Sequence, residues 1–249
     1  MPCDIPAYSL PGVNHQVLLA RCPNGIPVAA DFTMVETPVP VPGEGEILVR
    51  NIYLSVDPAQ RGWASAEANY SAPVPLGTPM RALGVGVVLK SHNPDYEPGE
   101  FLYGWLGWQD YAVIGEKQIV HRAKEDIPLA GFLALIGIAG TTAYFGLTEL
   151  GRPRPGDVLL VSTAAGSVGS LVGQLGKSLG CRTIGLTGSD EKAERCRTRF
   201  GYDVAINYRA GNLAEKLAEA APEGINIFFD NVGGAILDTA LRHLDRKST

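Results

Sequence analysis

A glycine-rich turn between a predicted strand and a predicted helix is the clearest chemical feature of the chain. Residues 163–170 read T-A-A-G-S-V-G-S and follow an apolar strand predicted at 157–162. Set against the pattern G-x-G-x-x-G, the turn has Gly166 and Gly169 at the second and third positions and Ala164 at the first. The second glycine lets the backbone approach a pyrophosphate, the third lets the helix pack on the strand, and the helix N-terminus attracts anions. The turn predicts a dinucleotide site, and the ordinary tight turn of a flavodoxin-like sheet is the alternative.

The end of the next predicted strand bears on the choice of cofactor. An NAD enzyme places an acidic residue there, on the ribose 2′-hydroxyl. Here that end reads T-G-S-D-E-K, with Gly188 and Ser189 at the tip. Lys192 follows one helical turn later and could meet a 2′-phosphate as a point charge, which favours NADPH. Two alternatives stay open: Asp190 could hold the ribose of NAD, or Ser189 or Asp190 could be an N-cap beside a solvated Lys192.

Two more polar residues follow predicted strands. Asn231 lies at the carboxyl end of a strand predicted at 225–230, where such sheets bind ligands, so it could contact a cofactor. Its alternative role is an Asx-turn before two glycines. Tyr208 ends a strand predicted at 204–207 and could cover the adenine ribose, although the sequence alone favours packing on the sheet edge.

A parallel sheet would position these residues. From residue 157, strands predicted at 157–162, 183–187, 204–207 and 225–230 alternate with helices predicted at 168–179, 191–199, 213–221 and 235–244. The segments 158–161 and 225–229 are mostly apolar, as in parallel sheets covered by helices on both faces. Pro and Gly punctuate the earlier part, around short runs at 46–52, 84–90 and 110–114 that predict a β-rich domain. We therefore expect an α/β fold with two domains, residues 1–126 and 127–249.

Composition excludes several classes of protein. Of 249 residues, 45% are hydrophobic and 19% charged, and a net charge of −5 without a basic run argues against nucleic acid as a partner. Four cysteines without a C-x-x-C pair argue against a zinc ribbon or a disulfide framework and favour a reducing, cytoplasmic location. The N-terminus has no signal-peptide pattern. Residues 127–148 lack charge and could span a bilayer, but their glycines favour a buried helix between domains rather than a membrane segment.

Several longer motifs together resemble one known family over nearly the whole chain. They are N-I-Y-L-S-V-D-P-A-Q-R-G at 51–62, G-T-T-A-Y-F-G-L at 140–147, A-A-G-S-V-G-S-L-V-G-Q at 164–174, G-S-D-E-K at 188–192, N-Y at 207–208 and F-D-N-V-G-G at 229–234. In these motifs the chain is similar to the zinc-independent medium-chain dehydrogenase/reductases of the prostaglandin reductase and alkenal double-bond reductase family.

The resemblance implies a GroES-like N-terminal domain followed by a Rossmann domain that binds NADPH. It implies that Gly166, Ser167, Val168 and Gly169 line the pyrophosphate, that Lys192 and Tyr208 hold the NADPH-specific end, and that Asn231 contacts the cofactor. The implied reaction is hydride transfer to the β-carbon of an α,β-unsaturated aldehyde or ketone, and full-length members are expected to be homodimers. An NADPH quinone reductase, or a shortened chain that binds a dinucleotide without turnover, are the alternatives.

The chain also departs from the family pattern. Where the family reads D-P-Y-M-R, this chain has Ala59 in place of the tyrosine of the substrate pocket. Arg61 is a candidate residue at the pocket edge, although a turn salt bridge with Asp57 explains it equally well. Zinc-binding relatives carry a zinc-ligating cysteine and a G-H-E motif in the first domain. Here His15, His92 and His121 are isolated and residues 83–87 read L-G-V-G-V, so we expect no metal. Tyr53 and Tyr144 are expected in the core, and no catalytic acid is assigned.

The number of strands is the largest departure. A Rossmann sheet has about six strands, and only four are predicted before the charged tail at 245–249. We hypothesise a fragment, a premature stop or an altered C-terminus, which would leave the 225–229 strand at an open edge.

Overall fold

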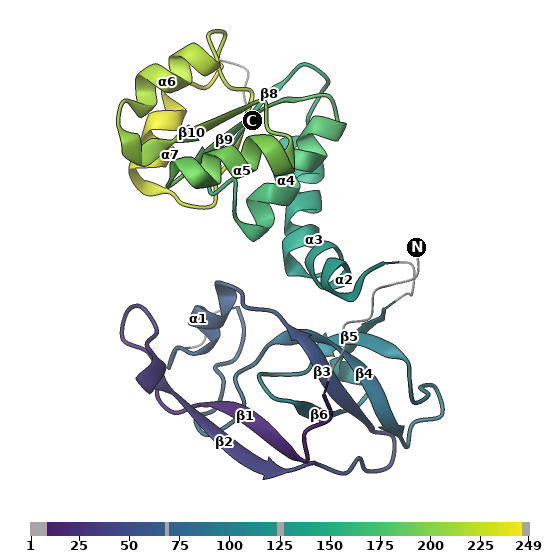
Figure 1. Cartoon of the computed structure of the whole chain (residues 1–249). Helices are drawn as coiled ribbons and strands as arrows, with labels where there is room; N and C mark the ends of the chain where they lie inside the picture. Colours follow the sequence, from purple (N-terminus) through teal and green to yellow (C-terminus); the bar gives the residue numbers. More distant parts are fainter. Residues whose placement is uncertain (1–8, 68–69, 124–126, 246–249) are drawn as a thin grey trace. The chain divides into compact units, whose positions relative to one another are not determined.

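Residues 9–67, 70–123 and 127–245 are described by the computed structural model. Its internal packing separates two units, Met1–Leu133 and Ala134–Thr249 (Figure 1). The boundary predicted after residue 126 falls on a gap between the described ranges, and Cys3 and residues 246–249 of the predicted tail also lie outside them. The two units are described in turn.

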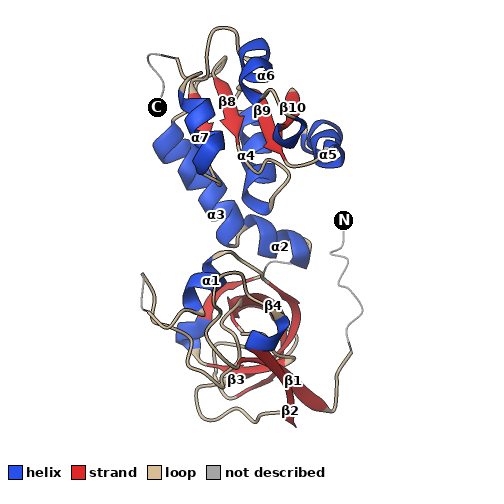
Figure 2. Ribbon diagram, turned by 90° about the vertical axis from the view of Figure 1, so that its left-hand side faces the viewer, coloured by secondary structure: helices blue, strands red, loops and turns tan. Residues whose placement is uncertain are grey.

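The first unit is built mainly of antiparallel strands, which curve around one another in the view of Figure 2. A two-stranded sheet pairs β1 (Val13–Leu19) with β2 (Phe32–Pro38). A five-stranded sheet in the order β6-β3-β4-β5-β7 contains β3 (Ile47–Leu54), β4 (Leu83–Ser91), β5 (Phe101–Trp105), β6 (Tyr111–Ile114) and β7 (Ile119–Arg122). Short helical turns η1 (Ala29–Asp31), α1 (Ala59–Trp63) and η2 (Glu116–Gln118) connect them. The β-rich domain is confirmed, and its core is formed by Ile47, Val49, Val88, Leu102, Leu106, Ala112 and Ile114.

The uncharged segment at 127–148 is not one buried helix. It forms α2 (Leu129–Leu135), α3 (Ile138–Phe145) and the π-helical turn η3 (Gly146–Gly151). The backbone of Gly137 is extended and caps α3, which interrupts the helix. Tyr144 and Phe145 are 52% and 56% exposed, so the prediction of burial is wrong for this part. Among the described residues no single helix has the length and apolarity to cross a bilayer, although α2 with the α3–η3 helix, bent by 42°, meets those criteria as a pair.

The second unit contains a four-stranded parallel sheet in the order β10-β9-β8-β11. Its strands are β8 (Val158–Val161), β9 (Arg182–Thr187), β10 (Val204–Asn207) and β11 (Ile227–Phe229). The connecting helices are α4 (Ser167–Ser178), α5 (Asp190–Phe200), η4 (Tyr208–Ala210), α6 (Leu213–Ala220) and α7 (Gly234–Leu241). The predicted alternation and the Rossmann-type α/β class are confirmed.

Alternating side chains of the central strand β8 divide the core into two layers. Leu159 and Val161 pack with α3, α4 and residues of α5, whereas Leu160 packs with α6 and α7 on the other face. All three side chains are fully buried. Because both faces of β8 are covered, its sequence is continuously apolar, and the carboxyl ends of the strands are left as the place where polar residues gather.

The last described residues add to the sheet beside β11. The helix predicted to run to residue 244 ends at Leu241, and Leu244 forms an isolated parallel bridge with Ile225. The N–H of Ile225 donates to the carbonyl of His243 at 2.8 Å, and the N–H of Asp245 donates to the carbonyl of Ile225 at 2.9 Å. The backbone of Ile225 is therefore paired on this side of the sheet.

Candidate functional site

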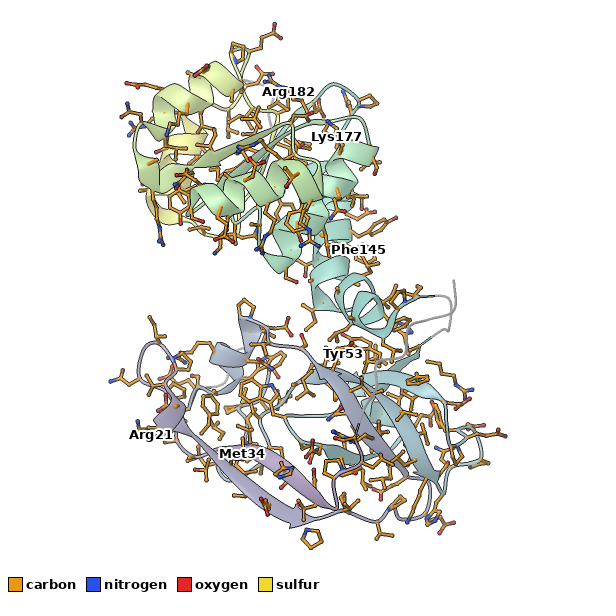
Figure 3. The ribbon with its side chains drawn as sticks, viewed as in Figure 1. Arg21, Met34, Tyr53, Phe145, Lys177 and Arg182 are labelled. Atoms are coloured by element: carbon orange, nitrogen blue, oxygen red, sulfur yellow. The ribbon has the colours of Figure 1, made fainter. Side chains whose placement is uncertain are left out.

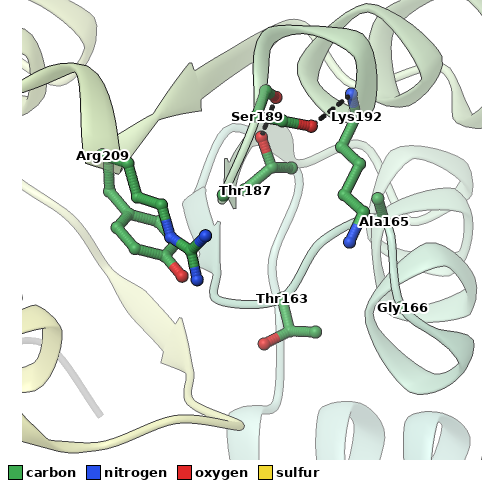
Figure 4. A pocket seen from close by; sticks show the side chains of 9 residues that line it. Thr163, Ala165, Gly166, Thr187, Ser189, Lys192 and Arg209 are labelled. Carbon is green, nitrogen blue, oxygen red and sulfur yellow. Dashed lines mark hydrogen bonds between the residues drawn. The ribbon is translucent and has the colours of Figure 1, made fainter.

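A pocket of about 280 Å³ lies at the carboxyl ends of β8, β9 and β10 (Figure 4). Its lining consists of Thr163, Ala165, Gly166, Thr187, Gly188, Ser189, Lys192, Tyr208 and Arg209. The pocket thus brings together three residues predicted from sequence, Gly166, Lys192 and Tyr208. We call residues 163–169 the glycine turn, and Gly188, Ser189, Lys192, Tyr208 and Arg209 the cationic tip.

The glycine turn leaves no room for larger residues. A Cβ on Gly169 would lie 2.4 Å from the carbonyl oxygen of Thr163, and one on Gly166 would lie 2.7 Å from the Thr163 methyl group. Gly166 caps α4 without any side-chain hydrogen bond to the first turn, so the N–H groups of Ser167, Val168 and Gly169 begin the helix uncapped. This arrangement suits an anion placed at the helix N-terminus.

Thr163 enters the turn in a strained conformation. Its φ of 51° is in the left-handed region, which a β-branched residue rarely adopts. Its carbonyl accepts a hydrogen bond from the N–H of Gly166 at 2.8 Å, which closes the turn. Strain of this kind persists where the surrounding structure fixes the backbone, often at binding sites.

A buried tyrosine supports the glycine turn from behind. The hydroxyl of Tyr202 donates to the carbonyl of Gly169 at 2.6 Å, and the side chain is 3% exposed. A Cβ on Gly173 would lie 2.2 Å from the Tyr202 ring, so the glycine is required for this contact. Burial raises the pKa of Tyr202 well above its ordinary value and keeps the phenol neutral. Sequence reasoning did not find Tyr202, because its contact depends on tertiary packing.

Asp203, the next residue, ties α4 to the start of β9. Its carboxylate forms an ion pair with Lys177, which is labelled in Figure 3, and accepts hydrogen bonds from the N–H and hydroxyl of Thr183 at 2.8 and 3.1 Å. Desolvation raises the pKa of Asp203, but the hydrogen bonds from Lys177 and Thr183 outweigh it, and the net pKa is below the ordinary value.

The cationic tip begins where β9 passes into α5. The Oγ of Ser189 accepts a hydrogen bond from the N–H of Lys192 at 3.3 Å and caps α5, as one of the alternatives proposed. The Thr187 hydroxyl donates to the Ser189 carbonyl at 3.1 Å and fixes the turn. The Lys192 side chain nevertheless lines the pocket and extends toward Ala165 of the glycine turn (Figure 4). The carboxylate of Asp190 accepts from the side chain of Asn207 at 3.0 Å and is not among the lining residues.

Tyr208 and Arg209 form the opposite wall of the pocket. Tyr208 lines it and also packs on the core layer beneath α6, so both roles weighed for this residue are compatible with its position. The guanidinium of Arg209 lies over the Tyr208 ring, 5.9 Å from its centroid. Sequence reasoning missed Arg209; a basic residue directly after Tyr208, at the carboxyl end of a strand, was the signal available.

Asn231 is engaged with the end of β8. Its side-chain amide donates to the carbonyl of Ser162 at 3.0 Å, and its N–H donates to the Ser162 hydroxyl at 2.7 Å. The Asx-turn at this point is made by Asp230, whose carboxylate accepts from the N–H groups of Val232 and Gly233 at 3.0 and 2.9 Å. Asn231 is exposed but does not line the pocket. Its contact with a cofactor stays a prediction.

Arg61 of α1 is held by a loop rather than by an acid. Its guanidinium donates to the carbonyls of Gly25 and Pro23 at 2.6 and 3.2 Å. No ion pair joins it to Asp57 within the described ranges, so the alternative of a turn salt bridge is wrong. Ala59, the residue that departs from the family pattern, is the first residue of α1. No group of three or more His, Cys, Asp or Glu side chains that could hold a metal occurs in the described part of the chain.

Comparison with known proteins identifies relatives for both units. Residues 15–121 match a family model described as the N-terminal domain of oxidoreductase, and residues 167–249 match one described as zinc-binding dehydrogenase. The chain is 41% identical over 228 residues to the NADPH-dependent curcumin reductase of Escherichia coli (strain K12), covering 92% of this chain and 66% of that protein. It is 37% identical over 234 residues to the NADP(+)-dependent 2-alkenal reductase of Nicotiana tabacum, covering 92% and 68%.

A solved structure has the same fold. The crystal structure of CurA from Vibrio vulnificus in complex with NADPH is similar with a TM-score of 0.87 and 38% identity, over 94% of this chain and 69% of that one. The chain spans about two thirds of the length of the relatives it matches.

Proposed function

Because the chain belongs to the prostaglandin reductase and alkenal double-bond reductase family of medium-chain dehydrogenase/reductases, we propose that it serves NADPH-dependent reduction of the carbon–carbon double bond of α,β-unsaturated aldehydes or ketones. The observation that carries the proposal is the pocket in which the glycine turn and the cationic tip meet. The relatives named above are reductases that use NADPH or NADP(+), which agrees with two cations at the tip.

The residues present fit a phosphorylated dinucleotide. The glycine turn has no Cβ at Gly166 or Gly169 to block a close backbone approach, and the uncapped first turn of α4 offers N–H groups to a pyrophosphate. Gly188, where an NAD enzyme would carry an acid, leaves the ribose end free of negative charge, and Lys192 reaches the same pocket. We propose that Gly166, Ser167, Val168 and Gly169 bind the pyrophosphate, and that Lys192 and Tyr208 bind the 2′-phosphate end.

The chemistry divides between cofactor and protein. NADPH, when bound, supplies a hydride to the β-carbon of the enone or enal; negative charge then develops on the carbonyl oxygen, and a proton must reach the α-carbon. We assign the second unit to NADPH and the first to substrate, with Arg61 as a residue at its edge. The proton donor is assigned to no residue. The expectation that Tyr144 and Tyr53 lie in the core is not met, since Tyr144 is exposed and Tyr53 is half-buried in β3.

We also propose a location and a mode of catalysis. The three described cysteines, Cys22, Cys181 and Cys196, are unpaired, which supports a reducing, cytoplasmic location. We propose a reaction without catalytic zinc, because the first domain lacks the G-H-E motif of the zinc-binding relatives.

A fluorescence titration with NADPH and NADH tests the cofactor assignment. We expect saturable binding that prefers NADPH, and a weaker preference in Lys192→Ala, because the ammonium group would attract the 2′-phosphate. Absence of any dinucleotide binding by the wild-type chain would contradict the proposal.

A turnover panel then tests the substrate class. Enals and enones should be reduced faster than quinones if the double-bond assignment is right. Faster turnover of quinones would favour the quinone reductase alternative, and tight NADPH binding with no turnover of either class would favour a non-catalytic chain.

A further inference from the structure

We propose that Arg209 is a second phosphate-binding cation, and that the 2′-phosphate of the cofactor is gripped between Arg209 and Lys192. This inference rests on the proposed NADPH site and names a specificity-determining residue within it. Both side chains line the same pocket, and Figure 4 shows them reaching into it from opposite sides. They come from different elements, Lys192 from α5 and Arg209 from η4.

Neither cation forms an ion pair within the described part of the chain. Among the described residues no carboxylate lies within 4.0 Å of Lys192 or Arg209, whereas Lys177, Arg195 and Arg197 in the same unit each have an acidic partner. Asp190, the acidic residue next to the tip, is hydrogen-bonded instead to Asn207. Two positive groups facing one pocket repel each other, and a bound anion relieves that repulsion.

Arg209 is held in place by the backbone around it. The side-chain oxygen of Asn207 caps η4 by accepting the N–H of Arg209 at 3.0 Å, and the amide of the same Asn207 donates to Asp190 at 3.0 Å. The guanidinium then rests on the ring of Tyr208, 5.9 Å from its centroid. Asn207 therefore holds the backbone of Arg209 and also binds the carboxylate of Asp190.

Gly188 lies directly beside the side chains of Arg209 and Tyr208. A Cβ at position 188 would lie 3.4 Å from the Nε of Arg209 and 3.3 Å from the hydroxyl of Tyr208. An acidic side chain at position 188 would therefore touch the Arg209 guanidinium, and the glycine leaves that guanidinium without an acidic neighbour at this position.

The two cations would recognise a phosphate in different ways. A guanidinium can donate two parallel hydrogen bonds to phosphate oxygens, and an ammonium acts as a point charge. The ribose 2′-hydroxyl of NADH offers no charge to either group. Loss of Arg209 should therefore weaken NADPH binding and leave NADH binding nearly unchanged.

Dissociation constants for NADPH and NADH test the inference in the full chain. The variants are Arg209→Ala, Arg209→Lys, Lys192→Ala and the double alanine variant. We expect Arg209→Ala to weaken NADPH about tenfold, Arg209→Lys to weaken it less, and the double variant to bring the two cofactors close to equal affinity. The matched control is Arg199→Ala, which removes the same charge from an exposed position of α5 that does not line the pocket, and which should change neither constant.

Adenosine 2′-monophosphate and adenosine 5′-monophosphate serve as probes that need no turnover. The wild-type chain should prefer the 2′-phosphate, and Arg209→Ala should reduce that preference. Equal weakening of NADPH and NADH in Arg209→Ala would overturn the inference, because it would indicate stacking on the adenine. An unchanged preference in Arg209→Ala would overturn it while leaving the proposed NADPH function intact. A wild-type chain without any preference for the 2′-phosphate would overturn both.

Discussion

The glycine turn and the cationic tip line the same pocket, but they are constructed in opposite ways. The glycine turn is fixed through its backbone: no Cβ fits between Gly169 and the Thr163 carbonyl, and the Gly169 carbonyl accepts a hydrogen bond from the Tyr202 hydroxyl. At the tip, Lys192 and Arg209 are exposed side chains held by caps. The difference suggests a division of labour, in which the turn binds what all dinucleotides share and the tip selects among them. Changes in the glycine turn should lower the stability and the affinity for both NADPH and NADH. Changes at the cationic tip should alter only the preference for NADPH over NADH.

Gly169→Ala should have the largest effect. The new methyl group would meet a backbone carbonyl and a Cα that cannot move independently, so we expect the free energy of unfolding to fall by about 2–3 kcal/mol and both cofactors to be lost. Urea denaturation and nucleotide titration measure the two effects. Gly12→Ala is the control, since nothing lies within 4 Å of its Cβ position. A stable Gly169→Ala variant that still binds NADPH tightly would contradict the view that close backbone contacts hold the glycine turn in place.

Gly188→Asp should reverse the cofactor preference. The acid would repel the 2′-phosphate, crowd Arg209 and offer an acceptor to the 2′-hydroxyl of NADH. We expect NADPH affinity to fall about 100-fold, with NADH affinity equal or higher and the stability changed by less than about 0.5 kcal/mol. Parallel titrations with both cofactors check this. If the affinities for NADPH and NADH fell by the same factor, the cationic tip would determine the shape of the pocket and would not select for the 2′-phosphate.

Tyr202→Phe should lower the stability and weaken both cofactors equally, as a change in the glycine turn does, but to a smaller extent. It removes one buried hydroxyl that bonds the Gly169 carbonyl and keeps the ring beside Gly173, so the unfolding free energy should fall by about 1 kcal/mol. NADPH and NADH should weaken by the same modest factor. A change in the ratio of the two affinities would argue that support of the turn and selection at the tip are not separate.

Asp203→Asn should have the smallest effect and should spare the site. Because its folded pKa lies below the ordinary 3.8, the ionised Asp203 contributes stability that is present above pH 3.8 and is lost as the pH falls through the folded pKa. We expect a loss of less than about 1 kcal/mol at pH 7, since the carboxylate is partly exposed. Urea denaturation at a series of pH values from 7 to below 3.8, with the exposed Asp238→Asn as control, should show the stability difference shrinking as the pH falls below 3.8. A stability difference that stays constant over the whole pH series would assign the effect to a cause other than the charge of Asp203.

The parallel sheet could be predicted because each of its strands lies between two helical layers. Leu159, Leu160 and Val161 are all fully buried, so β8 appears as an unbroken apolar run, and the glycine turn follows it directly. Strands of the first unit were harder to recognise. In β1 the buried Asn14 is satisfied by bonds to the backbone of Tyr111, which introduces a polar residue where a core position would be apolar. The strand β2 exposes Met34 and gives no clean alternation.

The parts of the site that escaped prediction depend on contacts distant in sequence. Tyr202 meets Gly169 across 33 positions, and nothing in the local sequence indicates that contact. Arg209 joins the pocket through Asn207 and the space above Gly188, which become neighbours only when β9 and β10 pair. The break at Gly137 was hidden because an apolar segment keeps the same composition whether its helix is straight or bent.

The exposed cations of the tip also govern how a ligand arrives. The chain carries a net charge of −5, which repels an anionic dinucleotide at a distance. Lys192 and Arg209 form a local positive region at the rim of the pocket, and diffusing molecules are drawn to that point first. We expect the phosphorylated ribose to contact the cationic tip first and the pyrophosphate to bind the glycine turn afterwards. The association rate constant should then fall as the ionic strength rises.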